Sequence, residues 1–511
     1  MARMQDSTSP QQEPARGTDG FLDRHAWVVI VLVYALARLI YFAMGVRFVT
    51  NALEDHWQFI DIPLMKDRLL ESLWYLHSQP PLMNLVCGLA VKAGAAGMIA
   101  LNLLFVGLGL TAALCLYRLL RRLGLGVGWA FAIELVFLFN PTMVLYENYL
   151  FYTQPVASLL CLAAWSLDRF LGQGRRRWAA VFFWCLAAIV LTRSPYHLAY
   201  LVGMAVLVPL LCPAGLRRRA LAMALIPVLA ATSWYVKNWA VFGQFSASSW
   251  LGMSLAKTWN DYVSPEEVKA LQARGELSVV AHLRPFRTVE EYQKVIPLPP
   301  PTGKPVLDQT IKTDKQPNYN HPIYIQASRL HLADAKVILK THPGAYLRNQ
   351  LDSWGSYFRP ASEYGFLGEQ NLRLVAPVET VYKRAFYLQP SSELPDKALK
   401  QSDRAAYLWG KVKNMSITII LGTAFVVLYI PFQAWRLWRS GQRRQAAVML
   451  FLWLNVVFVA LTANALEVGE NHRYRHETEP LWTVLLFAGL GDLVRRWRGR
   501  KSAPPAPAGV S

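Results

Sequence analysis

The sequence predicts an all-α polytopic membrane protein with about ten transmembrane helices. Hydrophobic residues make up 54% of the 511 residues and charged residues only 17%, whereas soluble domains carry about a quarter of charged residues. Apolar runs of about twenty residues recur along the chain, each long enough to cross a bilayer core of about 30 Å. Arginines cluster in short segments beside these runs, which is typical of loops retained on the cytoplasmic side.

The net charge of +20 would also suit a nucleic-acid-binding protein. Most of this charge comes from arginines beside the apolar runs, and arginines in such positions keep loops on the cytoplasmic side of a membrane. We therefore expect membrane lipids, and no nucleic acid, among the partners of the chain.

Residues 26–46 form the first predicted span, an anchor because no small-residue cleavage site follows a short apolar core. The apolar segment from Pro80 to Ala93 is about fourteen residues long and starts with two prolines, which favours an interfacial or re-entrant helix. If this segment does not cross and the N-terminus is cytoplasmic, every arginine-rich loop lies on one face, as the positive-inside rule requires.

Ten spans result from this reading: 26–46, 97–117, 127–145, 150–168, 178–192, 196–214, 220–240, 415–435, 446–463 and 481–494. The predicted divisions are a disordered cytoplasmic N-terminus 1–25, a transmembrane core 26–242 with its first outer loop at 47–96, a periplasmic region 243–414, C-terminal transmembrane helices 415–494 and a cytoplasmic tail 495–511. Within the periplasmic region, apolar spacing predicts helices over residues 323–340 and 347–358.

Two carboxylates, Glu54 and Asp55, follow the first span directly. A carboxylate at this water boundary could act as a general base for a hydroxyl nucleophile. The alternative is a solvated acidic turn. His77 lies in the same loop, before Pro80-Pro81; the prolines could orient it toward the outer pocket or simply start a helix.

Candidate anion-binding residues lie at the outer ends of later spans. Arg473 and Arg475 flank Tyr474, and the arginine fork suits phosphate; the alternative is a self-neutralised interface loop. Lys237 and Arg193 are two further cations on this face, and Lys237 could instead be an anchor in an aromatic belt.

Glu147, Asn148 and Gln154 could hydrogen-bond a sugar or help hold a metal. Carboxylates and the histidines His56, His472 and His476 could serve a divalent cation, with His56 and His472 the favoured ligands, although no diagnostic ligand spacing is present.

These motifs resemble the GT-C superfamily of membrane glycosyltransferases, in the branch related to protein O-mannosyltransferases and the lipid A aminoarabinose transferase. The resemblance lies in the acidic pair Glu54-Asp55, in Gln79-Pro80-Pro81-Leu82, and in Trp234 to Gly243. It also includes the Arg473-Tyr474-Arg475 segment. Lys237 stands where the family usually has arginine, and Gln79 where a charged residue or histidine is common.

The resemblance implies an inverting transferase that uses a polyprenyl-phosphate sugar on the periplasmic face of the bacterial inner membrane. Asp55 would be the base, with Glu54 as its neighbour or substitute. Lys237, Arg473 and Arg475 would contact the donor phosphate. From their positions on the outer face, and apart from the resemblance, we also expect Arg193 and His77 at the phosphate, and Glu147, Asn148, Gln154 and Tyr474 at the substrates. The acceptor could be a lipid, a glycan or a protein. The alternative is a transporter or flippase of a lipid-linked saccharide, which should carry ionisable residues at the bilayer midplane and paired repeats.

Overall fold

The computed structural model describes residues 18–393 and 402–501, and within them every regular element is a helix. Backbone pairing outside the helices is limited there to isolated bridges such as Val49 with Tyr149. The all-α class is therefore confirmed. Residues 1–17 of the predicted disordered N-terminus lie outside the described residues. Helix α1 begins at Thr18, so residues 18–25 are helical, which corrects the predicted disorder there.

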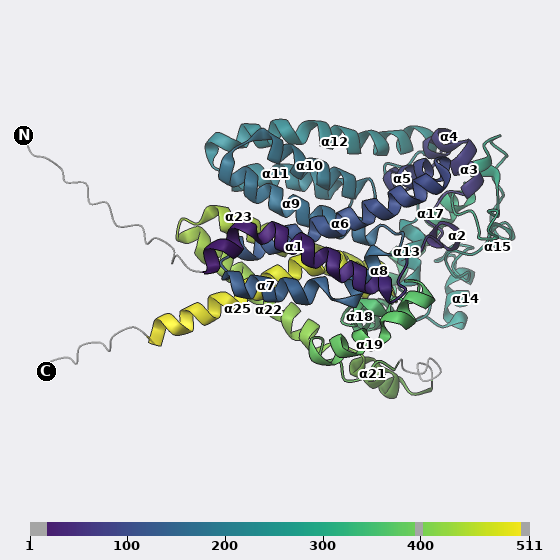
Figure 1. Cartoon of the computed structure of the whole chain (residues 1–511). Helices are drawn as coiled ribbons and strands as arrows, with labels where there is room; N and C mark the ends of the chain where they lie inside the picture. The colour runs from purple at the N-terminus through teal and green to yellow at the C-terminus, as the bar shows by residue number, and fades with distance from the viewer. Residues whose placement is uncertain (1–17, 394–401, 502–511) are drawn as a thin grey trace, which may run out of the picture.

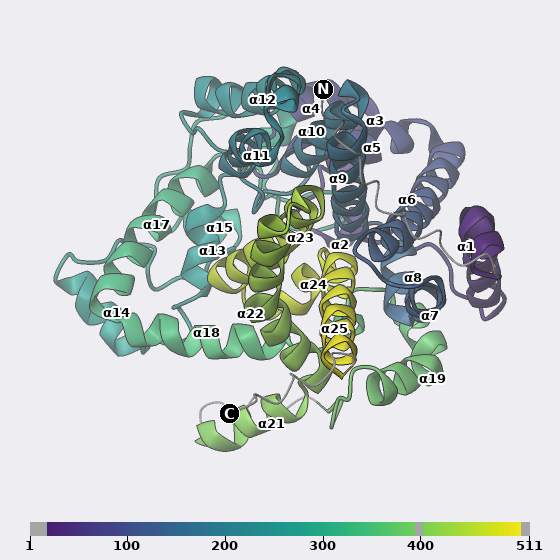
Figure 2. The same cartoon turned by 90° about the vertical axis from the view of Figure 1, so that its left-hand side faces the viewer.

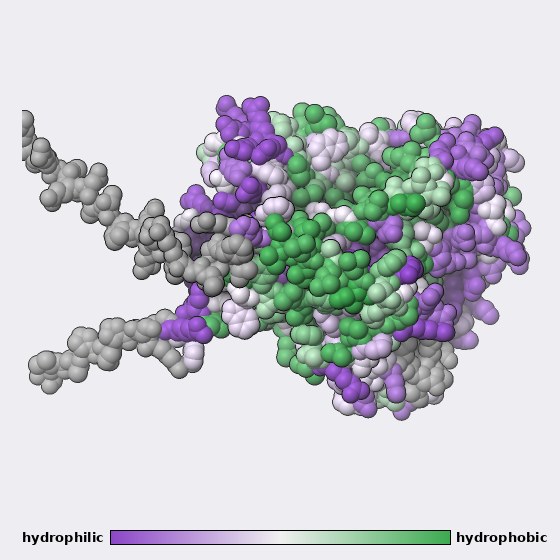
Figure 3. All heavy atoms as spheres, in the orientation of Figure 1, coloured by the Kyte–Doolittle hydropathy of each residue, from purple (hydrophilic) through white to green (hydrophobic). Residues whose placement is uncertain are grey.

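Long apolar helices form a bundle along the axis of the molecule (Figures 1 and 2). Five of the described helices are long and apolar enough to cross a bilayer. These helices are α1 (Thr18–Ala43, apolar from His25), α6 (Gly94–Arg122), α12 (Ala214–Phe242), α22 (Ile417–Arg439) and α23 (Arg443–Leu466). Figure 3 shows the matching surface, an apolar band between two hydrophilic ends. The polytopic class is thus confirmed.

The remaining predicted spans also coincide with helices, but these are shorter or more polar: α9 (Thr153–Gln173), α10 (Arg176–Val190), α11 (Leu198–Leu211) and α25 (Glu479–Lys501). The predicted count of ten is not confirmed, because length and composition support five or six spans among the described helices.

The predicted span 127–145 is broken. It consists of α7 (Val127–Leu138) and α8 (Pro141–Glu147), which meet at an angle of 57°. Pro141 has no N–H and disfavours helical backbone at the residue before it. The Asn140 side chain accepts a hydrogen bond from the Thr142 N–H at 2.9 Å and so caps the new helix. The break turns the chain so that the residues after α8 pair with Val49.

The arginine-rich segments gather at one end of the bundle. Asp168 near the end of α9 pairs with Arg122 at the end of α6 (2.8 Å) and with Arg444 at the start of α23 (2.5 Å). Asp492 in α25 pairs with Arg436 in α22 at 2.8 Å. This arrangement agrees with the predicted clustering of basic loops on one face, and the first loop and the 243–414 region lie at the other end (Figure 1).

Four short helices occupy the first loop: α2 (Ala52–Asp55), α3 (Ile62–Asp67), α4 (Leu69–Trp74) and α5 (Pro81–Lys92). The apolar segment after Pro80-Pro81 is the twelve-residue α5, too short to span a bilayer. The length of α5 is therefore consistent with the predicted interfacial or re-entrant helix.

The region 243–414 is helical as well. It contains α13 (Leu251–Lys257), α14 (Pro265–Ala273), α15 (Val289–Tyr292), α16 (Pro305–Asp308), α17 (Ile323–Thr341), α18 (Pro343–Tyr357), a 3-10 turn (Ala361–Glu363), α19 (Glu369–Ala385) and α21 (Arg404–Lys413). Helices α17 and α18 confirm the two predicted there, and Pro343 separates them.

Buried polar contacts fasten this region to the first loop. The Thr313 hydroxyl donates to Asp61 at 2.6 Å, and the Asn320 side chain accepts from the backbone N–H groups of His77 and Ser78. The Ser249 N–H donates to the His77 carbonyl at 2.9 Å. Residues about 170 to 250 positions apart in sequence thereby fix the loop that carries Asp55.

Candidate active site

Asp55 is held at the end of a one-turn helix directly after the first span. The Asn51 side chain donates to Asp55 Oδ2 at 2.8 Å, and both carboxylates of the Glu54-Asp55 pair are exposed. Behind them, Val49 exchanges backbone hydrogen bonds with Asn148 (2.8 Å) and Leu150 (2.9 Å). The acidic turn is thus anchored to the segment after α8, while its carboxylates stay accessible.

His56, the next residue, is buried, unlike the two carboxylates. Its Nε2 and the Tyr149 hydroxyl are hydrogen-bonded, and its ring packs on Phe151 at 4.6 Å between centroids. Burial lowers the pKa of His56 to about 3, and Arg473 adds to the effect. The imidazole is therefore neutral at physiological pH and fixes the loop beside Asp55.

A cavity of about 590 Å³ opens next to Asp55. Its walls come from the first loop, the segment after α8, the α10–α11 connection, the 243–414 region and the segment before α25. Of the predicted site residues, Asp55, His56, Arg193, Arg473 and Tyr474 line this cavity, and Glu54 does not.

Two buried guanidinium groups form one wall. Arg193 lies over the rings of Tyr152 (4.4 Å) and Tyr474 (4.0 Å) and pairs with Glu477 at 2.6 Å. Arg473 pairs with Glu470 at 2.5 Å and is also surrounded by aromatic rings. Each arginine is only 2% exposed.

The charges on this wall are only partly satisfied. Arg473 Nη1 and Arg193 Nη2 are buried and have no hydrogen-bond partner among the described residues. Burial alone would lower the pKa of Arg473, but Tyr152 and Glu470 raise it, so the group stays charged. A buried, charged donor without a partner calls for an acceptor that the protein does not supply. An oxyanion such as phosphate would provide one.

The other predicted phosphate contacts lie outside the cavity lining. Lys237 Nζ donates to the Leu76 carbonyl at 2.8 Å and lies over the Trp234 ring. Arg475 donates to the carbonyls of Tyr357 (3.1 Å) and Arg359 (3.2 Å) and pairs with Glu479. These contacts join backbone segments that border the site.

His77 likewise joins segments. Its Nε2 donates to the Asn320 carbonyl at 2.8 Å, so in the neutral ring Nδ1 accepts from the Ser249 hydroxyl, also at 2.8 Å. Burial, together with the nearby charges of Lys237 and His321, lowers its pKa to about 3, although the hydrogen bond to Asn320 opposes the shift.

Acid is therefore expected to destabilise the fold. His56 and His77 stay neutral in the folded protein down to about pH 3, whereas in the unfolded chain each takes up a proton near pH 6.5. The contribution of the two neutral histidines to the free energy of unfolding is fully present above pH 6.5. As the pH decreases below 6.5, this free energy decreases by about 1.4 kcal/mol per pH unit for each histidine. The thermal midpoint of the purified protein between pH 7 and pH 5 measures this slope. A His77→Gln variant should show a shallower slope, and an unchanged slope would contradict the assignment.

The predicted sugar contacts on α8 and α9 are separate from the cavity. Glu147 makes a two-pronged ion pair with Arg38 of α1, at 2.9 and 2.7 Å. The Asn148 side chain donates back to Val144, and the Gln154 side chain donates to Ser158. Glu147 and Gln154 line only a space of about 10 Å³, about one water molecule in size.

Metal ligands are not grouped in the described part of the chain: no three His, Cys, Asp or Glu side chains there are placed to hold an ion. Each of the three candidate histidines has another partner: His56 bonds Tyr149, His472 Nδ1 bonds the Ser356 hydroxyl at 3.2 Å, and His476 Nδ1 contacts Glu479 at 3.3 Å.

The cavity also contains residues that the sequence did not single out. Lys257 from α13 pairs with Glu467 at 2.6 Å, and Tyr152 lies between the two arginines. Trp57 and Phe286 line another part. Only Trp57 carried a usable signal, because it lies two residues after Asp55; the others are brought in by folding.

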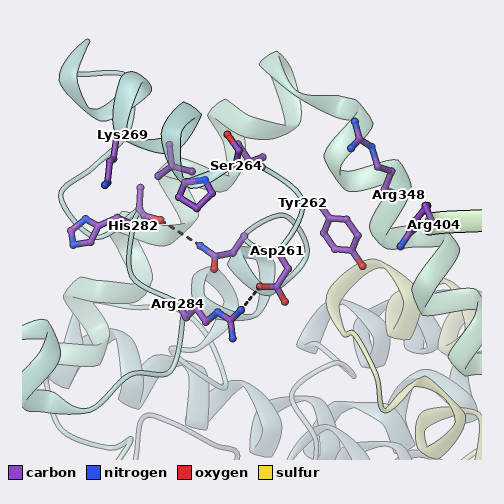
Figure 4. A pocket seen from close by; sticks show the side chains of 13 residues that line it. Asp261, Tyr262, Ser264, Lys269, His282, Arg284, Arg348 and Arg404 are labelled. Carbon is purple, nitrogen blue, oxygen red and sulfur yellow. Dashed lines mark hydrogen bonds and ion pairs between the residues drawn. The ribbon is translucent and has the colours of Figure 1, made fainter. Parts of the chain in front are cut away.

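A larger pocket of about 860 Å³ opens at the surface of the 243–414 region. Figure 4 shows Lys269, Arg348 and Arg404 around it, with Arg284 paired to Asp261. None of the predicted site residues lines this pocket. The smaller cavity, which combines a carboxylate with buried cations, is therefore the candidate active site.

No family model and no curated protein sequence matches this chain. The solved structure of ArnT from Cupriavidus metallidurans in the apo state is similar, at 15% identity and a TM-score of 0.30, over 95% of this chain and 82% of that one.

Proposed function

We propose that this protein is an inverting GT-C-type glycosyltransferase of the bacterial inner membrane. It moves one sugar from a polyprenyl-phosphate donor to an acceptor hydroxyl on the periplasmic face. The observation that carries this proposal is a single cavity of about 590 Å³ lined by the accessible carboxylate of Asp55 and by buried Arg193 and Arg473.

The reaction needs a base at one side of the anomeric carbon and an anion stabiliser at the other. Asp55 accepts the proton of the acceptor hydroxyl, and the hydroxyl oxygen forms the new bond to the anomeric carbon. The bond from that carbon to the phosphate oxygen breaks, and its electron pair leaves with the phosphate. Arg473 and Arg193 stabilise the developing charge with N–H groups that have no other partner in the described chain.

The position of the cavity suits a lipid-linked donor. Its lining includes His197, the residue before α11, and Leu466, the last residue of α23. The cavity thus reaches the ends of apolar helices, where the phosphate of a membrane-embedded carrier would lie. The hydrocarbon chain can then stay in the bilayer while the sugar enters the protein.

The transport alternative has weaker support. The ionisable groups within the bundle include Arg38 and Glu147, but they neutralise each other and border a space of only about 10 Å³. Such a pair holds two helices together and borders no space that a saccharide could occupy.

We expect membranes that contain the wild-type protein to transfer label from at least one of a panel of radiolabelled polyprenyl-phosphate sugars. The product should have the opposite anomeric configuration, because a single displacement inverts the carbon. Thin-layer separation and nuclear magnetic resonance of the product measure both. No consumption of any donor, together with flipping of the labelled lipid in liposomes, would support the transporter instead.

A further inference from the structure

Four aromatic side chains form a cluster beside the candidate base. Trp57 stacks on Phe286 with centroids 5.5 Å apart and contacts Tyr319 at 4.8 Å. Trp250 packs edge-on against Phe286 at 5.3 Å. Trp57 follows Asp55 by two residues, whereas the other three rings come from the 243–414 region. The cluster therefore joins the loop of the base to a region with no assigned role.

This cluster is open to the cavity. Trp57, Trp250 and Phe286 all line it, and Trp57 keeps 38% of its surface exposed although it packs on two rings. Part of the indole is thus available to a ligand that reaches Asp55.

The backbone at Phe286 is strained in a way that serves this arrangement. Its φ is +61°, in the left-handed region that non-glycine residues rarely adopt. The Tyr319 hydroxyl holds the Phe286 carbonyl with a hydrogen bond of 2.7 Å. Strain of this kind is kept where the surrounding structure enforces it, commonly at ligand sites. Here it places the Phe286 ring against Trp57.

Unused polar groups lie in the same cavity. Gln58 and Gln316 are lining residues of this cavity, both half-buried, and the hydrogen bonds found for them within the described chain involve backbone atoms. Each side-chain amide can both donate and accept. Flat aromatic surface beside free amides matches a pyranose ring, which has a C–H face for the negative face of an aromatic ring and hydroxyls at its edge.

We propose that this aromatic cluster is the acceptor subsite and that the acceptor is a saccharide, held by stacking on Trp57. This inference rests on the proposed function, which it deepens by naming the acceptor class. The donor sugar is assigned elsewhere, because the buried arginines pack with Tyr152 and Tyr474, and Trp57 is placed next to the base that the acceptor hydroxyl must reach.

The first test measures binding without any donor. Pyranose di- and trisaccharides of gluco, galacto and manno configuration are titrated into the full-length protein in nanodiscs, with calorimetry as the readout. Wild type should bind at least one of them, Trp57→Ala at least tenfold more weakly, and Trp57→Phe within about threefold of wild type. Trp74→Ala is the matched control, because Trp74 lies in the same loop, is 55% exposed and does not line the cavity.

The second test uses transfer kinetics. Trp57→Ala should raise the KM for the saccharide acceptor at least tenfold and leave the KM for the donor within about twofold. A rise in the donor KM alone, or wild-type transfer only to a protein or to a sugar-free lipid, would overturn the inference. Absence of transfer by wild type would contradict the proposed function, whereas absence of saccharide binding in the first test would contradict the acceptor subsite.

Discussion

Asp55→Asn is expected to lower the turnover number for sugar transfer by about 10³-fold, because the amide cannot accept the proton of the acceptor hydroxyl. The KM for the donor should change little, since Asp55 makes no contact with Arg193 or Arg473 among the interactions of the described chain. Folding should be retained: Asp55 is exposed, and its side chain bonds only the neighbouring Asn51. Initial rates with saturating donor and acceptor measure the effect.

Glu54→Gln is the matched control for this substitution. Glu54 is the preceding residue on the same short helix and is also exposed, but it does not line the cavity. We expect it to retain more than half of the wild-type rate. If Asp55→Asn kept more than a tenth of the activity while Glu54→Gln abolished it, the base would be Glu54. Full activity in both variants would exclude the acidic pair from catalysis.

The helical class and the positions of most elements could be predicted from the sequence because they depend on local properties. Apolar runs, prolines and arginine clusters act over one or two turns, and they located α6, α12, α17 and α18 within a few residues. The break in the span at Asn140-Pro141 has a local signal as well. The apolar run from 127 to 145 is nevertheless long enough to predict one continuous span, so the break at Asn140-Pro141 was not predicted.

The composition of the site could be predicted only in part. Asp55 and Arg473 could be predicted as site residues because each lies in a charged segment at the end of a predicted span. Their meeting in one cavity depends on Val49 pairing with Leu150 and on Thr313 bonding Asp61, contacts between distant segments. Lys257 and Phe286 also reach the cavity through contacts between distant segments. In the sequence they lie in the 243–414 region, and no motif marks them as site residues.

The structure also distinguishes Arg473 from Arg475, two residues that have the same predicted role in the sequence. Arg473 and Arg475 flank Tyr474 and look equivalent as phosphate ligands. On the short helix α24 (Asn471–His476), two residues apart means opposite sides, so one faces the cavity and the other faces the carbonyls of Tyr357 and Arg359. The spacing could reveal this difference only once the helix was known.

This difference between the two arginines gives the second prediction. Arg473→Lys is expected to lower kcat/KM for the donor by about 10²-fold, because lysine keeps the charge but lacks the planar fork that can hold Glu470 and a phosphate oxygen together. Arg475→Lys is the matched control: it should lower the thermal midpoint, since backbone carbonyls lose their partners, but it should leave the donor KM within about twofold of wild type. Donor saturation curves and thermal melts of both variants measure the two effects. The contrary result is that Arg475→Lys lowers kcat/KM for the donor as much as Arg473→Lys does. That result would mean that both arginines affect donor binding by positioning the segment, and that the unpaired N–H of Arg473 is not the phosphate contact.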